Sequence, residues 1–118
     1  MPTKEEVQQF LEAFYAQKND HGIMYYQRKK NLNALLELEI SAKRRTKVLN
    51  QLTVDDYYKG PKPDGVLKGT EFWEFGKKVR KKEVYIKISL GLEGKPVRCL
   101  SFHPAERPIK YPFRSSSD

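Results

Sequence analysis

Residues 83–106, EVYIKISLGLEGKPVRCLSFHPAE, decide the fold that we predict for this chain. In the first half, apolar residues at positions 84, 86, 88 and 90 alternate with Tyr85, Lys87 and Ser89. Alternation with a period of two, rich in β-branched and aromatic residues, predicts a strand with one buried and one polar face. A glycine-containing turn follows. Residues 97–102 then form a second strand that is apolar on both faces, which places it inside a sheet rather than at an edge.

The length of 118 residues fits a single domain over residues 1–118. We divide it into an N-terminal helix extension (1–22), a core (23–106) and an extended basic tail (107–118). No run approaches the ~18 apolar residues of a membrane span, so no membrane association is expected. The charged N-terminus also lacks the apolar segment of a signal peptide.

The cysteine and histidine content argues against a metal centre. The chain has one cysteine, Cys99, and two histidines, which cannot build a structural zinc site of any usual pattern. Cys99 falls within a predicted buried strand, where a cysteine serves as a small core residue. We therefore expect no metal, no cofactor and a reducing, cytoplasmic location.

Upstream of the two strands, the sequence predicts helices and one short strand. Thr3 and Glu6 form a capping-box pattern before a helix over residues 3–17, which residues 19–22 are expected to break. The further elements expected are a short edge strand at residues 23–26, helices capped by Asn31 and Ser41, a loop over residues 61–70 and a strand over residues 71–76. This order predicts an α+β fold in which an antiparallel sheet meander packs against N-terminal helices.

The formal net charge of +8 favours polyanionic partners: RNA, DNA or an acidic protein. Solubility alone is the other interpretation of such a charge. Two basic runs stand out, and each is either a solvated loop or a set of phosphate contacts. The candidate RNA contacts are Arg28, Lys29, Lys30, Lys77, Lys78, Lys81, Lys82 and, on the first of the two strands, Lys87.

Several polar groups are expected on one face of the sheet. Tyr85 and Lys87 share a strand face, Glu74 can face them from the preceding strand, and His103 leaves the end of the following one. Lys59 precedes the loop that leads into the meander. A carboxylate, an imidazole, a phenol and ammonium groups suit metal-free cleavage of an RNA phosphodiester, although such groups on an exposed face can also be merely solvated.

Four motifs resemble the MqsR toxin family, ribonucleases of type II toxin–antitoxin systems with a RelE-like fold. They are LTVDDYYK at residues 52–59, WE at 73–74, EVYIKI at 83–88 and SF at 101–102. Their order and spacing match across residues 23–103. The resemblance implies a site at Lys59, Glu74, Tyr85 and His103. It therefore also implies a RelE-like, MqsR-like form of the α+β fold.

The chain departs from the family pattern at two of these positions. The better-known member of the family has glutamine in place of Glu74 and lysine in place of His103. A carboxylate and an imidazole are better proton-transfer groups near neutral pH than an amide and an ammonium. Residues 101–106 and 111–113 have no counterpart in that member, which indicates a divergent branch.

The resemblance implies an mRNA-cleaving endoribonuclease toxin, a hydrolase that a cognate antitoxin protein holds inactive. Glu74 is the candidate base and His103 the candidate acid. Lys59 and Lys87 would stabilise the phosphate, and Tyr85 would position groups or relay a proton. Two alternatives remain open: a non-catalytic RNA-binding module, and a protein-interaction domain whose charge serves an acidic partner.

Overall fold

The computed structural model describes residues 1–114, and residues 115–118, the end of the predicted basic tail, lie outside the described residues. The elements in chain order are α1 (Lys4–His21), β1 (Ile23–Tyr25), α2 (Lys29–Leu38), α3 (Ala42–Leu49), the 3₁₀ helix η1 (Val54–Asp56), β2 (Tyr57–Pro63), β3 (Glu71–Val79), β4 (Lys82–Ser89) and β5 (Val97–Pro104). They form the predicted α+β fold, which is built on a five-stranded sheet. In residues 1–114, no helix is long and apolar enough to cross a membrane.

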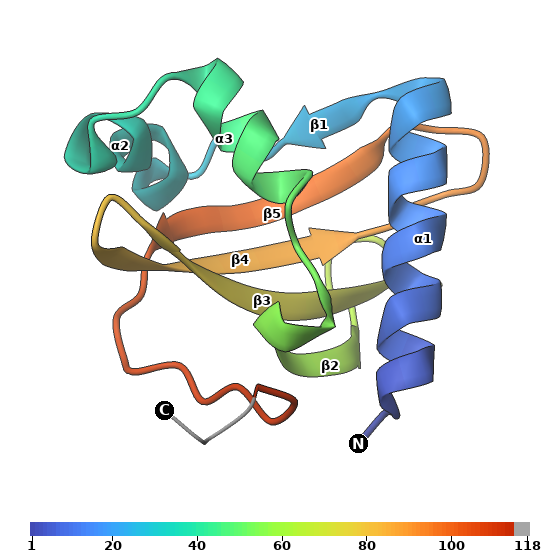
Figure 1. The fold of residues 1–118 in the computed structure, drawn as a ribbon. Coiled ribbons are helices and arrows are strands. Elements are labelled where there is room, and N and C mark those ends of the chain that lie inside the picture. Colours follow the sequence, from blue (N-terminus) through green and yellow to red (C-terminus); the bar gives the residue numbers. More distant parts are fainter. Residues whose placement is uncertain (115–118) are drawn as a thin grey trace.

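The strands lie in the order β1-β5-β4-β3-β2 (Figure 1). The predicted antiparallel meander is confirmed for β2 to β5. The expectation of a purely antiparallel sheet was wrong, because the edge strand β1 pairs parallel to β5, with Ile23 opposite Val97. A short edge strand can pair in either direction, and its residue pattern does not encode which.

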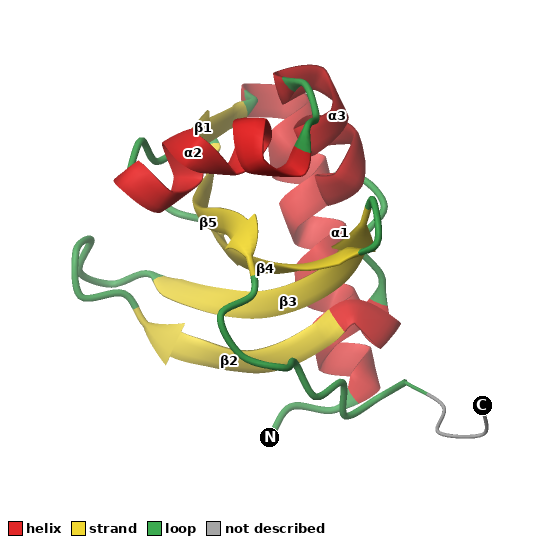
Figure 2. Cartoon of the chain, turned by 90° about the vertical axis from the view of Figure 1, so that its left-hand side faces the viewer, coloured by secondary structure: helices red, strands yellow, loops and turns green. Residues whose placement is uncertain are grey.

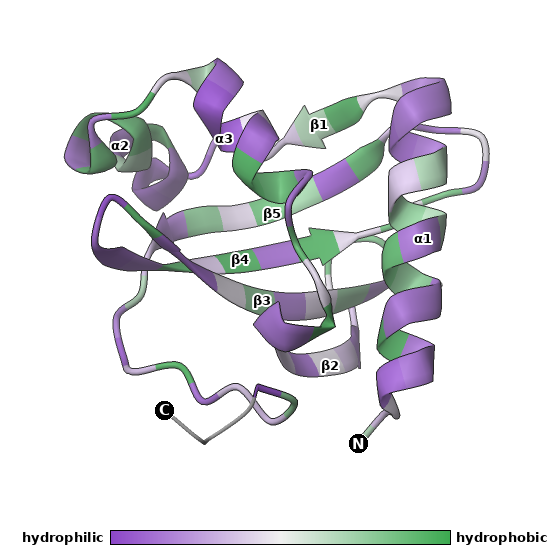
Figure 3. Cartoon of the chain, in the orientation of Figure 1, coloured by the Kyte–Doolittle hydropathy of each residue, from purple (hydrophilic) through white to green (hydrophobic). Residues whose placement is uncertain are grey.

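The alternation in β4 sorts its side chains as predicted. Val84, Ile86 and Ile88 are fully buried, and hydrophobic and hydrophilic residues alternate along the strand (Figure 3). We call the opposite side of the sheet, which carries Tyr85 and Lys87, the polar face. The cross-strand register extends that face over β3 and β5.

β5 lies inside the sheet as predicted, but the expectation that both of its faces are apolar was wrong. Arg98 is buried on the polar face and forms an ion pair of 2.8 Å with Asp64. Its guanidinium also donates to Tyr26 and to Thr70. A buried charge is tolerated only when it is paired in this way. The pair ties the loop between β2 and β3 to the sheet.

The loop itself is shorter than predicted. β2 continues to Pro63, so the loop begins at Asp64 rather than at residue 61. Prolines suggested an irregular stretch, but an edge strand tolerates proline because one side of it has no ladder to complete.

Helices α1 and α3 lie on the side of the sheet opposite the polar face (Figure 2). Phe10 of α1 stacks on Trp73 with ring centroids 4.5 Å apart, and the hydroxyl of Tyr15 donates to the carbonyl of Leu52 at 2.7 Å. The predicted capping box of Thr3 and Glu6 is confirmed. The expected break at residues 19–22 comes later, because the helix runs to His21 and ends at Gly22, whose φ is 81°.

Helix α2 covers the sheet edge rather than a face. It begins at Lys29, so Asn31 is not its cap. The buried Asn31 side chain instead donates to the carbonyl of Leu100 at 2.8 Å and accepts from the N–H of Phe102 at 3.1 Å. The carbonyl of Leu100 and the N–H of Phe102 belong to the part of β5 that extends past its pairing with β1, where an additional strand would otherwise bind them. The helix therefore closes the open edge of β5 and brings its own first turn to the polar face.

The C-terminal segment, residues 105–114, packs against the protein. Glu83 accepts hydrogen bonds from the N–H of Ile109 and the hydroxyl of Tyr111. Gly76 makes this approach possible, because a Cβ there would lie 2.6 Å from Ile109 Cδ1. The described part of the predicted extended tail is thus held in place over the polar face.

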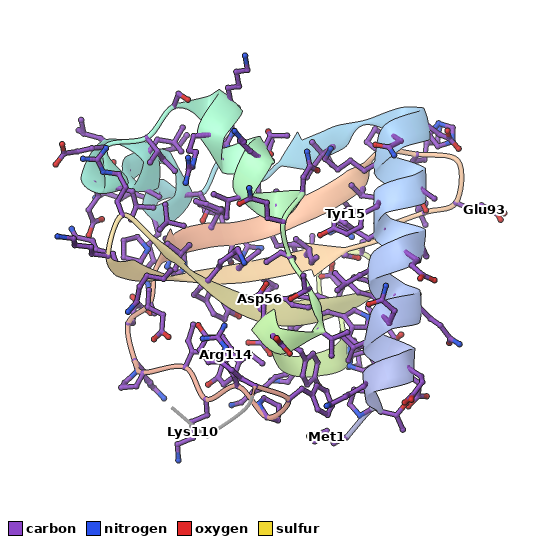
Figure 4. The ribbon with its side chains drawn as sticks, in the orientation of Figure 1. Met1, Tyr15, Asp56, Glu93, Lys110 and Arg114 are labelled. Carbon is purple, nitrogen blue, oxygen red and sulfur yellow. The ribbon has the colours of Figure 1, made fainter. Side chains whose placement is uncertain are left out.

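Past Tyr111, the same segment reaches η1. Phe113 stacks on Tyr57 with centroids 5.4 Å apart, and Arg114 pairs with Asp56 at 3.1 Å (Figure 4). The segment therefore bridges the two sides of the sheet.

Candidate functional site

A cleft of about 460 Å³ opens on the polar face between the start of α2 and the start of the C-terminal segment. Cations dominate its lining. The cationic lining residues are Arg28, Lys29, Lys30, Lys87 and Arg107, and the others are Asn31, Tyr85, Ser101, His103 and Glu106. Strand alternation supplies the residues from β4 and β5, whereas helix α2 supplies those from the opposite wall.

The sheet register aligns the candidate residues in two adjacent rows. In one row, Lys87 of β4 lies opposite Glu74 of β3 and Ser101 of β5. In the other, Tyr85 lies opposite His103. Directly opposed residues in a sheet have Cβ atoms about 4.5–5.5 Å apart, so neighbouring members of each row are within contact distance. The structure thus brings Glu74, Tyr85, Lys87 and His103 to one surface.

Tyr85 and Glu74 form a tight pair. The Tyr85 hydroxyl donates to Glu74 Oε1 at 2.6 Å. Glu74 is only 7% exposed, and its other oxygen lies 3.0 Å from Lys62 Nζ, an ion pair without hydrogen-bond geometry. Burial, and then the hydrogen bond to the carboxylate, raise the pKa of Tyr85. The phenol is therefore neutral and directed at the carboxylate, and Glu74 itself does not line the cleft.

His103 lies beside Tyr85, with ring centroids 5.5 Å apart. Its Nδ1 is 3.0 Å from the carbonyl oxygen of Pro104. A carbonyl only accepts, so this contact assigns a proton to Nδ1 and leaves Nε2 to exchange a proton with a ligand.

Lys87 is the cation at the centre of the cleft. Its ammonium lies 4.4 Å from the centroid of the Phe72 ring, and no ion pair among residues 1–114 includes it. Burial, and then the charge of Arg28, lower the pKa of Lys87. A half-buried ammonium without a carboxylate partner is a ready site for an anion.

The start of α2 adds positive charge to the same cleft. Arg28 is the N-cap but makes no side-chain capping bond, and the first turn contains no acidic residue. Cations at the positive end of a helix dipole are unfavourable unless an anion compensates them. Lys30 is partly compensated, because it forms an ion pair with Glu106 across the mouth of the cleft.

Some predicted residues lie elsewhere. Lys59 is opposite Glu74 in the register, but it is exposed and its ammonium lies over the ring of Tyr58 at 4.9 Å. Lys77 points to the other side of the sheet and pairs with Asp56 at 3.1 Å. The remaining predicted contacts are at the exposed β3–β4 hairpin and do not line the cleft: Lys78, Lys81 and Lys82.

Three residues of the site were missed from the sequence. Lys62, which pairs with Glu74, was hidden by the flanking prolines that suggested a loop. Arg107 lines the cleft from a segment that was predicted only to be an extended tail. Ser101 could have been found, because it lies two positions before His103 on the same strand face.

Cys99 is buried, and burial raises its pKa to about 12, as expected for a core thiol. Among the residues that the structure describes, no group of three or more histidine, cysteine, aspartate or glutamate side chains could hold a metal ion. The cleft instead combines fixed cations with a phenol–carboxylate pair and an imidazole. That combination can bind a phosphodiester and move protons around it.

No family model, no curated protein and no solved structure matches the chain.

Proposed function

We propose that the cleft binds RNA and cleaves it by attack of a ribose 2′-hydroxyl on the adjacent phosphate. One observation carries this proposal. The half-buried, unpaired Lys87 lines the same cleft as His103 and Tyr85, and the hydroxyl of Tyr85 is bonded to Glu74. The three kinds of group that such a reaction needs therefore share one surface.

The cations hold the phosphate. Lys87 and Arg28 are close enough for the charge of one to lower the pKa of the other, so an anion between them relieves their repulsion. The transition state carries more charge on the non-bridging oxygens than the ground state does. Fixed ammonium and guanidinium groups therefore lower the barrier as well as binding the substrate.

Tyr85 and Glu74 accept the proton of the attacking hydroxyl. Because Glu74 does not line the cleft, it acts through Tyr85. The 2′-hydroxyl passes its proton to the tyrosine oxygen while the tyrosine proton moves to Glu74 Oε1. This refines the predicted role of Glu74 as the base, and it gives Tyr85 the relay role.

His103 supplies the proton that the departing 5′-oxygen takes up. The bond from the 2′-oxygen to phosphorus forms as the bond from phosphorus to the 5′-oxygen breaks. The products are a 2′,3′-cyclic phosphate and a 5′-hydroxyl. Protons then return from Glu74 to His103 through solvent, and no step in this reaction involves a metal.

The wider proposal is that the chain is a cytoplasmic mRNA-cleaving toxin with a RelE-like fold and a cognate antitoxin. Its support is the resemblance to the MqsR family together with the positions of Glu74, Tyr85 and His103 on adjacent strands. Growth arrest on expression of the chain alone, relieved by His103→Ala, is the expected result. Harmless expression at a high level would contradict the toxin proposal.

The decisive experiment is incubation of the purified chain with single-stranded RNA in EDTA, followed by analysis of the new ends. We expect cleavage to persist and to leave cyclic phosphates with 5′-hydroxyl ends. Cleavage that stops in EDTA, or that leaves 5′-phosphates, would overturn the mechanism.

A second candidate function is RNA binding without cleavage. It is favoured by the engagement of both Glu74 oxygens, one by Tyr85 and one by Lys62. Under this alternative, RNA bound by the chain is recovered intact, and His103→Ala changes nothing except affinity.

A further inference from the structure

A groove runs between α1 and the strands β2 and β3, well apart from the cationic cleft. It consists of two adjoining hollows of about 680 and 470 Å³ that share Phe10, Glu71, Trp73 and Leu90. None of the residues that line it also lines the cleft. The cleavage proposed above therefore leaves this surface unused.

Both hollows are lined by Trp73, the single tryptophan of the chain. It is half-buried, and it stacks on Phe10 while Tyr57 meets its edge at 6.2 Å. Pro61 and the exposed Met1 add apolar surface to the lining. A tryptophan packed between other rings in a concave surface of mixed polarity is typical of the centre of a protein–protein interface.

The charge of the groove is opposite to that of the chain. Although the chain carries +8, the only charged side chains in the lining are Glu6 and Glu71, which together outweigh the single positive charge of the Met1 amino group in the same hollow. Glu6 also accepts from the N–H of Thr3, whereas Glu71 takes part in none of the ion pairs among residues 1–114. Because salt screens charges beyond about 8 Å, a segment in the groove experiences these two carboxylates more than charges farther away, and no lysine lines either hollow.

The strand beside the groove cannot extend the sheet. β2 is an edge strand, but Pro61 and Pro63 lack the N–H groups that an added strand would need. An occupant must therefore bind through its side chains.

We propose that this groove binds a peptide segment of a partner protein, in which one or two large apolar side chains are flanked by lysine or arginine. The apolar side chains cover Trp73, and the flanking cations meet Glu6 and Glu71. This interaction is independent of RNA cleavage, and it explains why an acidic, apolar surface persists on a strongly basic chain.

Fluorescence of Trp73 tests the proposal directly, because no other tryptophan contributes. The probes are acetyl-Gly-Lys-Leu-Phe-Lys-Gly-amide and its counterpart with both lysines replaced by glutamate. We expect the basic peptide to shift the emission to shorter wavelength in a saturable way, and to bind at least about fivefold more tightly than the acidic one.

Two variants with the same change in net charge distinguish the effect of a carboxylate in the groove from the effect of the overall charge on peptide binding. Glu71→Lys should abolish the preference for the basic peptide. Glu93→Lys, in the loop between β4 and β5 but not among the residues that line the groove, should keep it (Figure 4).

Three results would overturn the proposal. They are equal or tighter binding of the acidic peptide, no shift with either peptide at millimolar concentration, and a shift produced by raising the protein concentration alone. The last result would assign the groove to a second copy of the chain. RNA cleavage is measured on the same samples, so failure of one proposal is distinguishable from failure of the other.

Discussion

At the scale of single residues, the hydroxyl of Tyr85 and the carboxylate of Glu74 form one proton-accepting unit. The hydrogen bond of 2.6 Å joins them, and Glu74 is nearly buried. Residues that act as a unit lose activity together, and the second change adds little to the first. Non-additive losses of activity therefore distinguish a proton relay through Tyr85 and Glu74 from independent contributions of the two residues.

We therefore expect Tyr85→Phe and Glu74→Gln each to slow cleavage by about a hundredfold or more, and the double variant to be no slower than the worse single one. Single-turnover rates at saturating RNA measure the effect. Urea unfolding of each variant is the control, because Tyr85→Phe leaves a buried carboxylate oxygen unpaired at a cost of about 1–3 kcal/mol. Additive losses would show that Glu74 and Tyr85 act separately.

His103 donates a proton instead of accepting one, so its replacement should have different kinetic effects. His103→Ala should lower the cleavage rate by about a hundredfold or more and keep most of the RNA affinity. His103→Lys should retain partial activity, because an ammonium can also donate a proton. Comparison of the rates with filter-binding affinities tests this. Full activity of His103→Ala would remove the imidazole from the mechanism.

Lys87 should bind RNA at the expense of stability. Its pKa is lowered, so the folded chain holds this proton less tightly than the unfolded chain does, and the charged residue destabilises the fold at neutral pH. Lys87→Met removes the ammonium that lies over the Phe72 ring and keeps an unbranched apolar side chain at this position. We expect it to raise the free energy of unfolding by less than about 1 kcal/mol, because solvent screens a half-exposed charge, while weakening RNA binding.

The lowered pKa of Lys87 also determines how its effect on stability changes with pH. The penalty from Lys87 is fully present below its folded pKa and disappears as the pH rises toward 10.5, the ordinary lysine value. The stability advantage of Lys87→Met should therefore shrink between neutral and alkaline pH. Lys110→Met, at an exposed position of the C-terminal segment, is the matched control and should show no such trend (Figure 4).

At the scale of elements, one side chain connects α2 to the sheet. Asn31 bonds the carbonyls of Tyr26 and Leu100 and the N–H of Phe102. The amide thus substitutes for the strand that would otherwise continue beyond β1. Because Arg28, Lys29 and Lys30 lie at the start of α2, this contact also fixes one wall of the cleft.

Asn31→Ala should lower the free energy of unfolding by about 1–3 kcal/mol, because it leaves buried backbone groups unpaired. Asn33→Ala, on the exposed side of the same helix, makes the same change in helix propensity and should have little effect. Denaturant unfolding measures both. Equal losses in the two variants would mean that the edge of β5 is satisfied by water.

At the scale of the whole molecule, the positive charge is divided between two sides of the sheet. Arg28 and Lys87 line the cleft, whereas Lys77 and Arg114 form ion pairs with Asp56 of η1. The net charge of the chain therefore overestimates the number of cations that can contact RNA.

RNA affinity should fall steeply with salt, because phosphate binding releases condensed counterions. Arg28→Ala should reduce the slope of log affinity against log salt concentration by about 0.7, the value for one contact to a single strand. Lys77→Ala removes the same charge and should leave the slope unchanged. Titrations between low and moderate salt test both, and an affinity that barely depends on salt would contradict the proposed phosphate contacts.

The sequence was sufficient to predict those elements whose structure follows from local periodicity and capping. The alternation around Tyr85 and Lys87 predicted β4 and the composition of its two faces. The patterns at Thr3 and Ser41 predicted caps that the structure confirms. Placing Glu74 beside Tyr85 required only one antiparallel hairpin, whose register depends on a short connection.

Contacts between distant segments were decided only by the tertiary structure. The parallel pairing of β1 with β5, the buried pair of Arg98 and Asp64, and the use of Asn31 as an edge partner all join residues far apart in sequence. The same holds for Arg107, whose place in the cleft depends on how the C-terminal segment packs. Periodicity tells which side chains share a face, but long-range packing decides which segment covers that face and which charges remain free.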